Sequence, residues 1–195
     1  MRSYTVIRGG LGLAGLLVAG SLAGAVPAHA QTGGATAPGY TPPTAPQPAQ
    51  NAQMGVATLN ADGSATAPVD APRQVRKAIN AANRIRFKPY RWGGGHSKFK
   101  SKGYDCSGAV SYVLHAAGLL KRPLASGPLA SRWGSRGVGQ WITVYANRGH
   151  AYMVVAGLRF DTSAVGESLN RGSGPRWRGS ARSTGGYKAK YFQGL

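Results

Sequence analysis

The stretch Gly103-Tyr104-Asp105-Cys106-Ser107-Gly108 runs directly into an apolar pattern that decides the local fold. Apolar residues then recur at spacings of three and four, which predicts one buried helix face with Cys106 in the first turn. These residues are Ala109, Val110, Val113, Leu114 and Ala117. A thiol at a helix N-terminus lies near unpaired N–H groups and the positive end of the helix dipole, which favour the thiolate. The stretch therefore predicts a nucleophilic cysteine.

Cys106 is also the only cysteine among the 195 residues, so the chain offers it no intramolecular disulfide partner. The alternative to a catalytic role is a common one, because a lone cysteine at the start of a helix often serves as a small buried hydrophobic residue. A catalytic interpretation therefore depends on what the rest of the chain brings near the sulfur.

A strand-rich half follows the helix. Segments 141–145 and 150–155 are dense in residues that favour β-structure, and 158–161 is a shorter segment beyond a tight connection. Trp177 and residues 187–192 are expected to add edge strands, whereas 126–139 is expected to be irregular and anchored by Leu129 and Trp133. Helices first and an antiparallel sheet afterwards predict an α+β domain.

The predicted hairpin aligns a base with an acid. His150 opens its first strand and Asp161 closes its second. A two-residue loop at Val155-Ala156 or Ala156-Gly157 places both side chains on one face, directly opposite or diagonal, whereas a three-residue loop separates them. On one face, Asp161 can fix the imidazole and leave its other nitrogen for a thiol. The alternative is that Asp161 caps a turn with Thr162 and Ser163.

The other histidines carry weaker signals. His29 lies in the N-terminal segment, and His115 falls in mid-helix, where a surface or packing role is expected. His96 follows a glycine run, where substrate contact is one interpretation. One cysteine, scattered histidines and few acids give no clustered ligand spacing, so we predict neither a metal site nor a cofactor.

Composition divides the chain into three blocks. Residues 1–30 combine positive charge, an apolar run and Ala28-His29-Ala30, which together predict an export signal cleaved after Ala30, with a single-pass membrane anchor as the alternative. Residues 31–72 are rich in Ala, Pro, Thr and Gln and predict a disordered linker. The folded domain is expected over 73–195. Its first helix is predicted to be capped by Asp70-Ala71-Pro72 and to end at Arg86.

The charge of the chain points to anionic partners. It has 24 Lys and Arg against 5 Asp and Glu, a formal net charge of +19. Such a field attracts polyanions. Export would direct the protein away from nucleic acid, so we expect anionic wall polymers and no nucleic-acid partner, with a merely solvated basic surface as the alternative. We expect a monomer that is secreted or associated with the cell wall.

Three motifs in this order resemble those of a known family. Tyr90-Arg91-Trp92-Gly93-Gly94, Asp105-Cys106-Ser107-Gly108 and Gly149-His150 are similar to the motifs of the NlpC-type peptidoglycan endopeptidases, which are exported papain-like cysteine hydrolases. The resemblance implies a papain-like α+β fold and hydrolysis of amide bonds in the stem peptides of bacterial peptidoglycan.

The resemblance also assigns roles to residues. It implies Cys106 as the nucleophile and His150 as the general base, and it places the hydroxyl of Tyr90 near the thiol, where it can help to hold the oxyanion. It puts Asp105 and Ser107 at the substrate amine. We add two neighbours to the expected substrate-binding residues, Trp92 and Gly93.

The chain departs from this family in two places. Many members have a histidine as the third polar residue, whereas this chain has Asp161, one residue earlier than expected. An acid orients the base at least as well and also stabilises an imidazolium. The basic tail beyond Glu167 has no counterpart that we can match. We therefore predict an exported cysteine hydrolase of cell-wall peptides. The alternatives are a non-catalytic basic wall-binding module and an acyl- or amide-transferring enzyme on the same fold.

Overall fold

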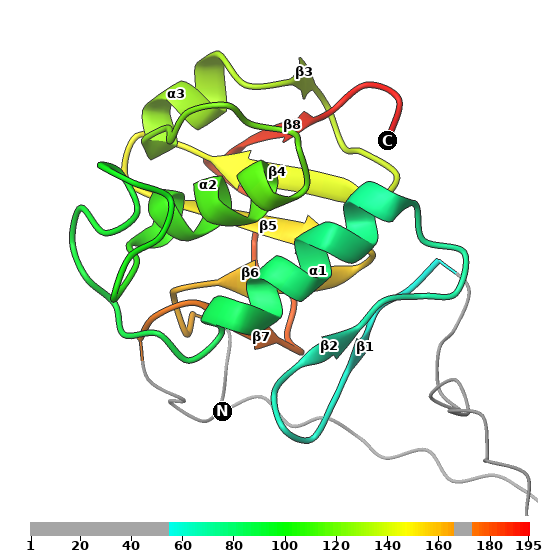
Figure 1. The fold of residues 1–195 in the computed structure, drawn as a ribbon. Helices are drawn as coiled ribbons and strands as arrows, with labels where there is room; N and C mark the ends of the chain where they lie inside the picture. The colour runs from blue at the N-terminus through cyan, green and yellow to red at the C-terminus, as the bar shows by residue number, and fades with distance from the viewer. Residues whose placement is uncertain (1–54, 166–172) are drawn as a thin grey trace, which may run out of the picture. The chain divides into compact units, whose positions relative to one another are not determined.

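The computed structural model describes residues 55–165 and 173–195 (Figure 1). The expected export signal and residues 31–54 of the expected linker lie outside this range, as does Glu167. The helices are α1 (Arg73–Ile85), α2 (Cys106–Ala116) and α3 (Ser126–Ser131). The strands are β1 (Thr58–Leu59), β2 (Ala65–Thr66), β3 (Ser135–Arg136), β4 (Ile142–Ala146), β5 (Ala151–Val155), β6 (Leu158–Asp161), β7 (Arg176–Arg178) and β8 (Lys188–Tyr191). Among the described residues, no helix has both the length and the apolar character needed to cross a bilayer.

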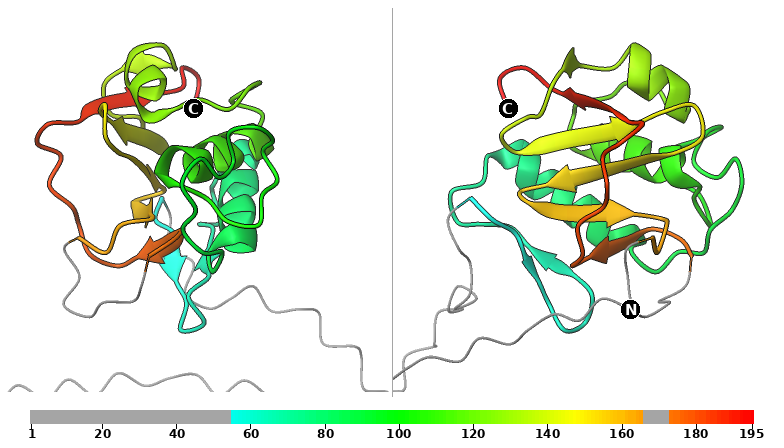
Figure 2. Two further views of the ribbon diagram at one scale, coloured as in Figure 1. Left: turned by 90° about the vertical axis from the view of Figure 1, so that its left-hand side faces the viewer. Right: turned by 180° about the vertical axis from the view of Figure 1, so that it is seen from behind.

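A six-stranded sheet forms the centre of the domain. Its strand order is β3-β8-β4-β5-β6-β7, and every neighbouring pair is antiparallel. Helices α1 and α2 pack together against one face (Figure 1; Figure 2, left). The predicted apolar stripe of α2 and the apolar residues of α1 are buried in this layer, as are the anchors Leu129 and Trp133. The predicted α+β class is therefore confirmed.

The sheet differs from the prediction at one edge. Strand β8 is not an edge strand, because it lies between β4 and the short β3. Segment 126–139 is also more regular than predicted, since it contains both α3 and β3. Strand β7 does lie at the edge, where Trp177 packs against Phe160.

The predicted linker ends earlier than residue 72. Strands β1 and β2 form a hairpin within it, and Ala57 and Ala65 are buried. Asn83 of α1 accepts the backbone N–H of Ala65 at 2.9 Å and donates to its carbonyl at 2.9 Å. The same Asn83 accepts from the Trp177 indole at 2.7 Å. This pairing compensates for the small apolar surface of the hairpin, so the prediction of disorder was wrong for residues 55–72.

The start of α1 also differs in detail. The helix begins at Arg73 after Pro72, and no side chain caps it. Asp70, which was expected to contribute to the cap, instead accepts the backbone N–H of Gly55 at 2.9 Å. The carboxylate therefore fastens the N-terminal end of the hairpin segment.

The chain between β7 and β8 crosses the sheet from one edge toward the other. We call residues 179–187 the strap. The strap passes over the sheet face opposite α1 and α2 (Figure 2, left and right). It belongs to the basic tail, and it carries Arg182 toward the centre of that face.

Candidate active site

Cys106 opens α2, as the sequence predicted. Asp105 is the N-cap, and its Oδ1 accepts the backbone N–H of Gly108 at 2.7 Å. The loop before the helix packs very closely against its first turn, because a Cβ on Gly108 would lie 1.9 Å from the carbonyl oxygen of Gly94. Only glycine fits there. The glycine-rich loop is thereby held beside the sulfur.

The β5–β6 hairpin has the two-residue loop that the sequence allowed. Ala156 and Gly157 both have positive φ, at 46° and 78°, which is the conformation of a tight hairpin turn. Val155 pairs with Leu158, and this register places Asp161 diagonally across from His150 on the same face. Nε2 of His150 lies 2.8 Å from Oδ1 of Asp161. The predicted alignment of base and acid is therefore present.

The imidazole also reaches the sulfur. Hydrogen bonding from His150 and from the backbone N–H of Ala151 stabilises the Cys106 thiolate. Because Nε2 already faces Asp161, Nδ1 is the nitrogen left for the sulfur. Burial disfavours the thiolate, but these hydrogen bonds and the charge of His150 outweigh it and lower the pKa of Cys106.

His150 shifts in the complementary direction. Burial disfavours the imidazolium, but the hydrogen bonds to Asp161 and Cys106 and their negative charges raise the pKa of His150 to about 9. A lowered thiol pKa beside a raised imidazole pKa favours a thiolate–imidazolium pair at neutral pH. The arrangement can therefore deliver both a nucleophile and a proton.

Asp161 is fully buried, and both of its oxygens are occupied. In addition to His150, Oδ1 accepts the backbone N–H of Ser163 at 2.9 Å, so the carboxylate also serves the turn-capping role considered above. Oδ2 accepts from Nη1 of Arg182 at 2.9 Å. Burial alone raises the pKa of a carboxyl, but here the His150 hydrogen bond and charge, the Ser163 N–H and Arg182 together lower it. Asp161 is thus held ionised and in one orientation.

Sequence reasoning missed Arg182. It is nearly buried, and its second terminal nitrogen donates to the Tyr187 hydroxyl at 2.7 Å. Its guanidinium also lies over the rings of Tyr152 and Tyr187, at 5.3 and 5.4 Å from their centroids. Tyr187 in turn packs edge-on against His150 at 6.3 Å. The strap therefore supports both the acid and the base.

Tyr90 lies in the segment between α1 and α2, where the charge of Cys106 acts on its phenol. Its backbone pairs with Tyr104, and the Arg91 N–H donates to the Tyr104 carbonyl at 3.1 Å. Burial, followed by the negative charges of Cys106 and Asp105, raises the pKa of the Tyr90 phenol. The phenol is thus near the thiol and keeps its proton, which it can donate to a developing oxyanion.

Asp105 and Ser107 are less available than the resemblance implied. The Gly93 N–H donates to Oδ2 of Asp105 at 3.1 Å, while His96 Nε2 lies 3.0 Å from Oδ1 and 3.2 Å from Oγ of Ser107. The carboxylate is therefore part of a loop network, and contact of Asp105 and Ser107 with substrate stays a prediction. His96, which is partly exposed, forms the outer end of this network.

The structure also shows the environments of Trp92 and His115. Trp92, expected to bind substrate, is 87% exposed beside Tyr90 and Gly93. His115 has the packing role that the sequence indicated, because its ring stacks on Phe99 at 3.8 Å and Nδ1 lies 2.9 Å from the Leu120 carbonyl oxygen. Among the described residues, no group of three or more His, Cys, Asp or Glu is placed to hold a metal ion.

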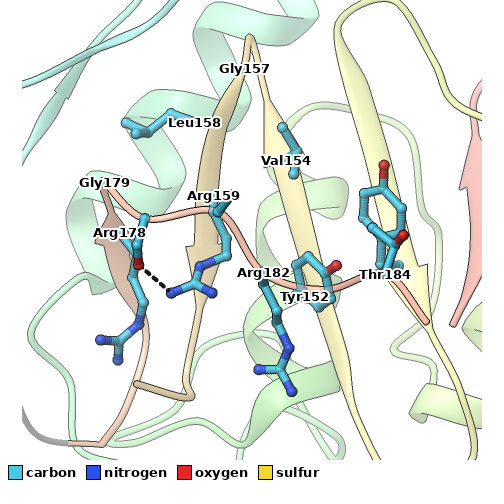
Figure 3. Close-up of a pocket in the computed structure, with 12 residues that line it drawn as sticks. Tyr152, Val154, Gly157, Leu158, Arg159, Arg178, Gly179, Arg182 and Thr184 are labelled. Atoms are coloured by element: carbon cyan, nitrogen blue, oxygen red, sulfur yellow. Dashed lines mark hydrogen bonds between the residues drawn. The ribbon is translucent and has the colours of Figure 1, made fainter. Parts of the chain in front are cut away.

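A cavity of about 290 Å³ lies beneath the strap, on the sheet face away from the helices (Figure 3). Arg159, Arg178 and Arg182 line it, together with Tyr152 and Tyr145. The Tyr152 hydroxyl is buried without a hydrogen-bond partner in the part of the chain that the structure describes, and burial is the main cause that raises its pKa to about 12. Neither Cys106 nor His150 lines this cavity.

No protein-family model matches the chain, and no curated protein matches it by sequence. Solved structures are similar at low identity. The peptidoglycan hydrolase RipB of Mycobacterium tuberculosis is 21% identical with a TM-score of 0.45, covering 62% of this chain and 68% of its own. RipA, a resuscitation-promoting-factor-interacting protein carrying a histidine substitution, is 22% identical with a TM-score of 0.43, covering 62% and 67%. A hypothetical invasion protein of Mycobacterium tuberculosis is 21% identical with a TM-score of 0.44, covering 70% and 73%.

Proposed function

We propose that this chain is an exported, papain-like cysteine peptidase that hydrolyses amide bonds in the stem peptides of peptidoglycan. One observation carries the proposal. The His150 imidazole stabilises the thiolate of the only cysteine, and Nε2 of the same ring lies 2.8 Å from a buried carboxylate. A nucleophile, a base and a group that orients the base are the parts that acyl transfer requires.

Acylation begins from the thiolate–imidazolium pair. The sulfur of Cys106 attacks the scissile carbonyl carbon, a C–S bond forms, and the carbonyl oxygen becomes an oxyanion. His150 then gives its proton to the departing nitrogen as the C–N bond breaks. The products are a thioester on Cys106 and a free amine.

Deacylation reverses the direction of proton transfer. The neutral His150 removes a proton from water, the resulting hydroxide attacks the thioester carbonyl, and the C–S bond breaks. The released carboxylic acid leaves a thiolate beside an imidazolium. Asp161 remains ionised throughout and stabilises the imidazolium form of the base.

The oxyanion needs hydrogen-bond donors at the start of α2. The Tyr90 hydroxyl is one candidate donor, and the backbone N–H groups of the first helical turn are others. The dipole of α2 adds to their effect, because its positive end faces the site.

Arg182 is a positioning residue in this account. Its bond to Oδ2 leaves Oδ1 of Asp161 for the imidazole, and its bond to Tyr187 fixes the ring that packs on His150. The strap thus affects the reaction indirectly, because Arg182 and Tyr187 position Asp161 and His150.

The substrate and the location rest on the sequence. The three motifs resemble wall endopeptidases, residues 1–30 have the features of an export signal, and a net charge of +19 suits an anionic envelope. The experiment is digestion of purified peptidoglycan by the wild-type protein and by Cys106→Ser, with the soluble fragments identified by mass spectrometry. Stem-peptide fragments from the wild type alone are expected. Identical fragment patterns would eliminate Cys106 chemistry and favour a wall-binding module.

A further inference from the structure

A groove of about 490 Å³ adjoins the catalytic base. It is formed by α3, the turn between β4 and β5, and the approach to β8, which meet at the end of the sheet where α2 and β5 begin (Figure 1). Three exposed cations line it: Arg132, Arg148 and Lys188. The remaining lining is polar backbone and small side chains, without an aromatic ring.

Asn147 ties this groove to His150. Its Oδ1 accepts the backbone N–H groups of His150 and Gly149, each at 2.9 Å, and its Nδ2 donates to the Gly186 carbonyl at 3.2 Å. At the start of α3, the Ser126 hydroxyl donates to the Arg148 carbonyl at 3.0 Å. The groove is therefore held in shape by the same contacts that position the catalytic strand.

The cations of the groove have no acidic partner among the described residues. The four acidic side chains in that range are used elsewhere. Asp62 pairs with Arg86, Asp70 caps a backbone N–H, and Asp105 and Asp161 are buried in the site. Three positive charges around one polar concavity create a potential that favours a ligand with more than one negative charge.

The position of the groove next to His150 determines which part of a substrate the groove contacts. His150 must reach the departing nitrogen to protonate it, so the released fragment lies on the His150 side of the cleft. Tyr90 and Trp92 precede α2 in the chain and do not line the groove.

We infer that the Arg132–Arg148–Lys188 groove is the subsite for the amine-releasing fragment of the substrate, and that it recognises a peptide carrying free carboxylates. This inference rests on the proposed peptidase function. Carboxylates fit the donors present, because guanidinium and ammonium groups bind them through charge-assisted hydrogen bonds.

The test uses two peptide substrates that differ only in the released fragment, with its carboxylates either free or amidated. The double variant Arg148→Gln/Lys188→Gln is compared with Lys77→Gln/Arg84→Gln, which removes two exposed charges from α1. The groove variant is expected to raise KM about tenfold for the free-carboxylate peptide alone, the size of two exposed charge contacts. The α1 variant should behave as wild type. A preference that survives in the groove variant, or that falls equally in both variants, would overturn the inference.

A second arm does not depend on catalysis. The full-length Cys106→Ala protein is titrated with the carboxylate-bearing fragment, and backbone amide shifts are followed by NMR. Shifts at Asn147, Arg148 and Lys188 are expected, and they should be lost with the amidated fragment. If hydrolysis fails while these shifts appear, the groove stands and the peptidase proposal falls. Absence of the shifts, or tighter binding of a glycerol-phosphate polymer than of the peptide, would refute the carboxylate subsite.

Discussion

The substitution Asp161→Asn is expected to remove the negative charge of Asp161 while keeping the size and shape of its side chain. Asn retains an oxygen that can accept from Nε2 of His150, but it removes the negative charge that stabilises the imidazolium. The Asn side chain also presents an amide group to Arg182 in place of a carboxylate. The Arg182 guanidinium thereby loses the only carboxylate that it contacts among the described residues. The fold should survive with reduced stability, because the side-chain volume is conserved.

The structure sets the size of the effect. The pKa of His150 rises from 6.5 to about 9, which corresponds to about 3 kcal/mol in favour of the imidazolium. The hydrogen bond to Asp161 is the largest of the favourable causes, followed by the bond to Cys106. Losing most of the Asp161 contribution should therefore lower kcat/KM by roughly 10²-fold.

The assay follows Cys106 directly. The rate constant for alkylation by iodoacetamide is measured from about pH 5 to about pH 10, a range that spans the ordinary pKa values of imidazole and thiol. In the wild type, the lowered pKa of Cys106 should keep the thiol reactive well below its ordinary range. In Asp161→Asn, the profile should move to higher pH, because a neutral imidazole no longer stabilises the thiolate. The wild-type kcat/KM should fall above about pH 9, where His150 loses the proton that the leaving nitrogen needs.

Asp62→Asn is the matched control, because Asp62 is exposed and pairs with Arg86 away from the site. It should leave the alkylation profile unchanged. If Asp161→Asn also leaves the profile unchanged while circular dichroism reports a folded protein, the carboxylate does not tune the base, and the triad reasoning is refuted.

Substitutions at three further residues test neighbouring contacts. Arg182→Gln should lower kcat roughly tenfold with little change in KM, and Arg182→Lys should recover part of it by restoring a charge near Asp161; an unchanged kcat in the Gln variant would remove the strap from the mechanism. Tyr90→Phe should lower kcat by roughly 10- to 100-fold if its hydroxyl holds the oxyanion, whereas full turnover in steady-state assays would show that assignment to be wrong. Gly108→Ala should reduce the free energy of unfolding by at least about 2 kcal/mol, since its Cβ would lie 1.9 Å from the Gly94 carbonyl oxygen; a urea midpoint equal to that of wild type would contradict this packing.

The contact between His150 and Asp161 was predictable because their alignment is local. A short loop at Ala156-Gly157 fixes the register of the hairpin, and the register alone decides whether His150 and Asp161 share a face. The cysteine helix was predictable for a similar reason, since its N-cap and apolar stripe lie within one short segment. The spacing of apolar residues predicts structure well within a single helix or hairpin.

Arg182 was not predictable from the chain. It meets Asp161 across 21 residues of sequence, through a strap without regular secondary structure, and it is one of many basic residues in a Gly- and Ser-rich tail. Nothing in its local sequence distinguishes it. Only the path of the strap over the sheet brings it to the carboxylate.

The β1–β2 hairpin carried a signal that was available. Asp62-Gly63 stands between two short segments containing Thr and Leu or Ala, a pattern typical of a tight hairpin. The prediction of disorder gave more weight to composition, and the buried residues of this hairpin are alanines that contribute little apolar area. Its order depends on side-chain pairing with Asn83, which lies 18 residues from Ala65.

The most direct test of the account is to trap the covalent intermediate. A stem-peptide substrate is mixed with the full-length protein, the reaction is quenched with acid, and the peptide containing Cys106 is examined by mass spectrometry. We predict an added mass equal to the acyl portion of the substrate on Cys106 in the wild type, and none in Cys106→Ser. Release of the same fragments at the wild-type rate by Cys106→Ser would contradict the central claim.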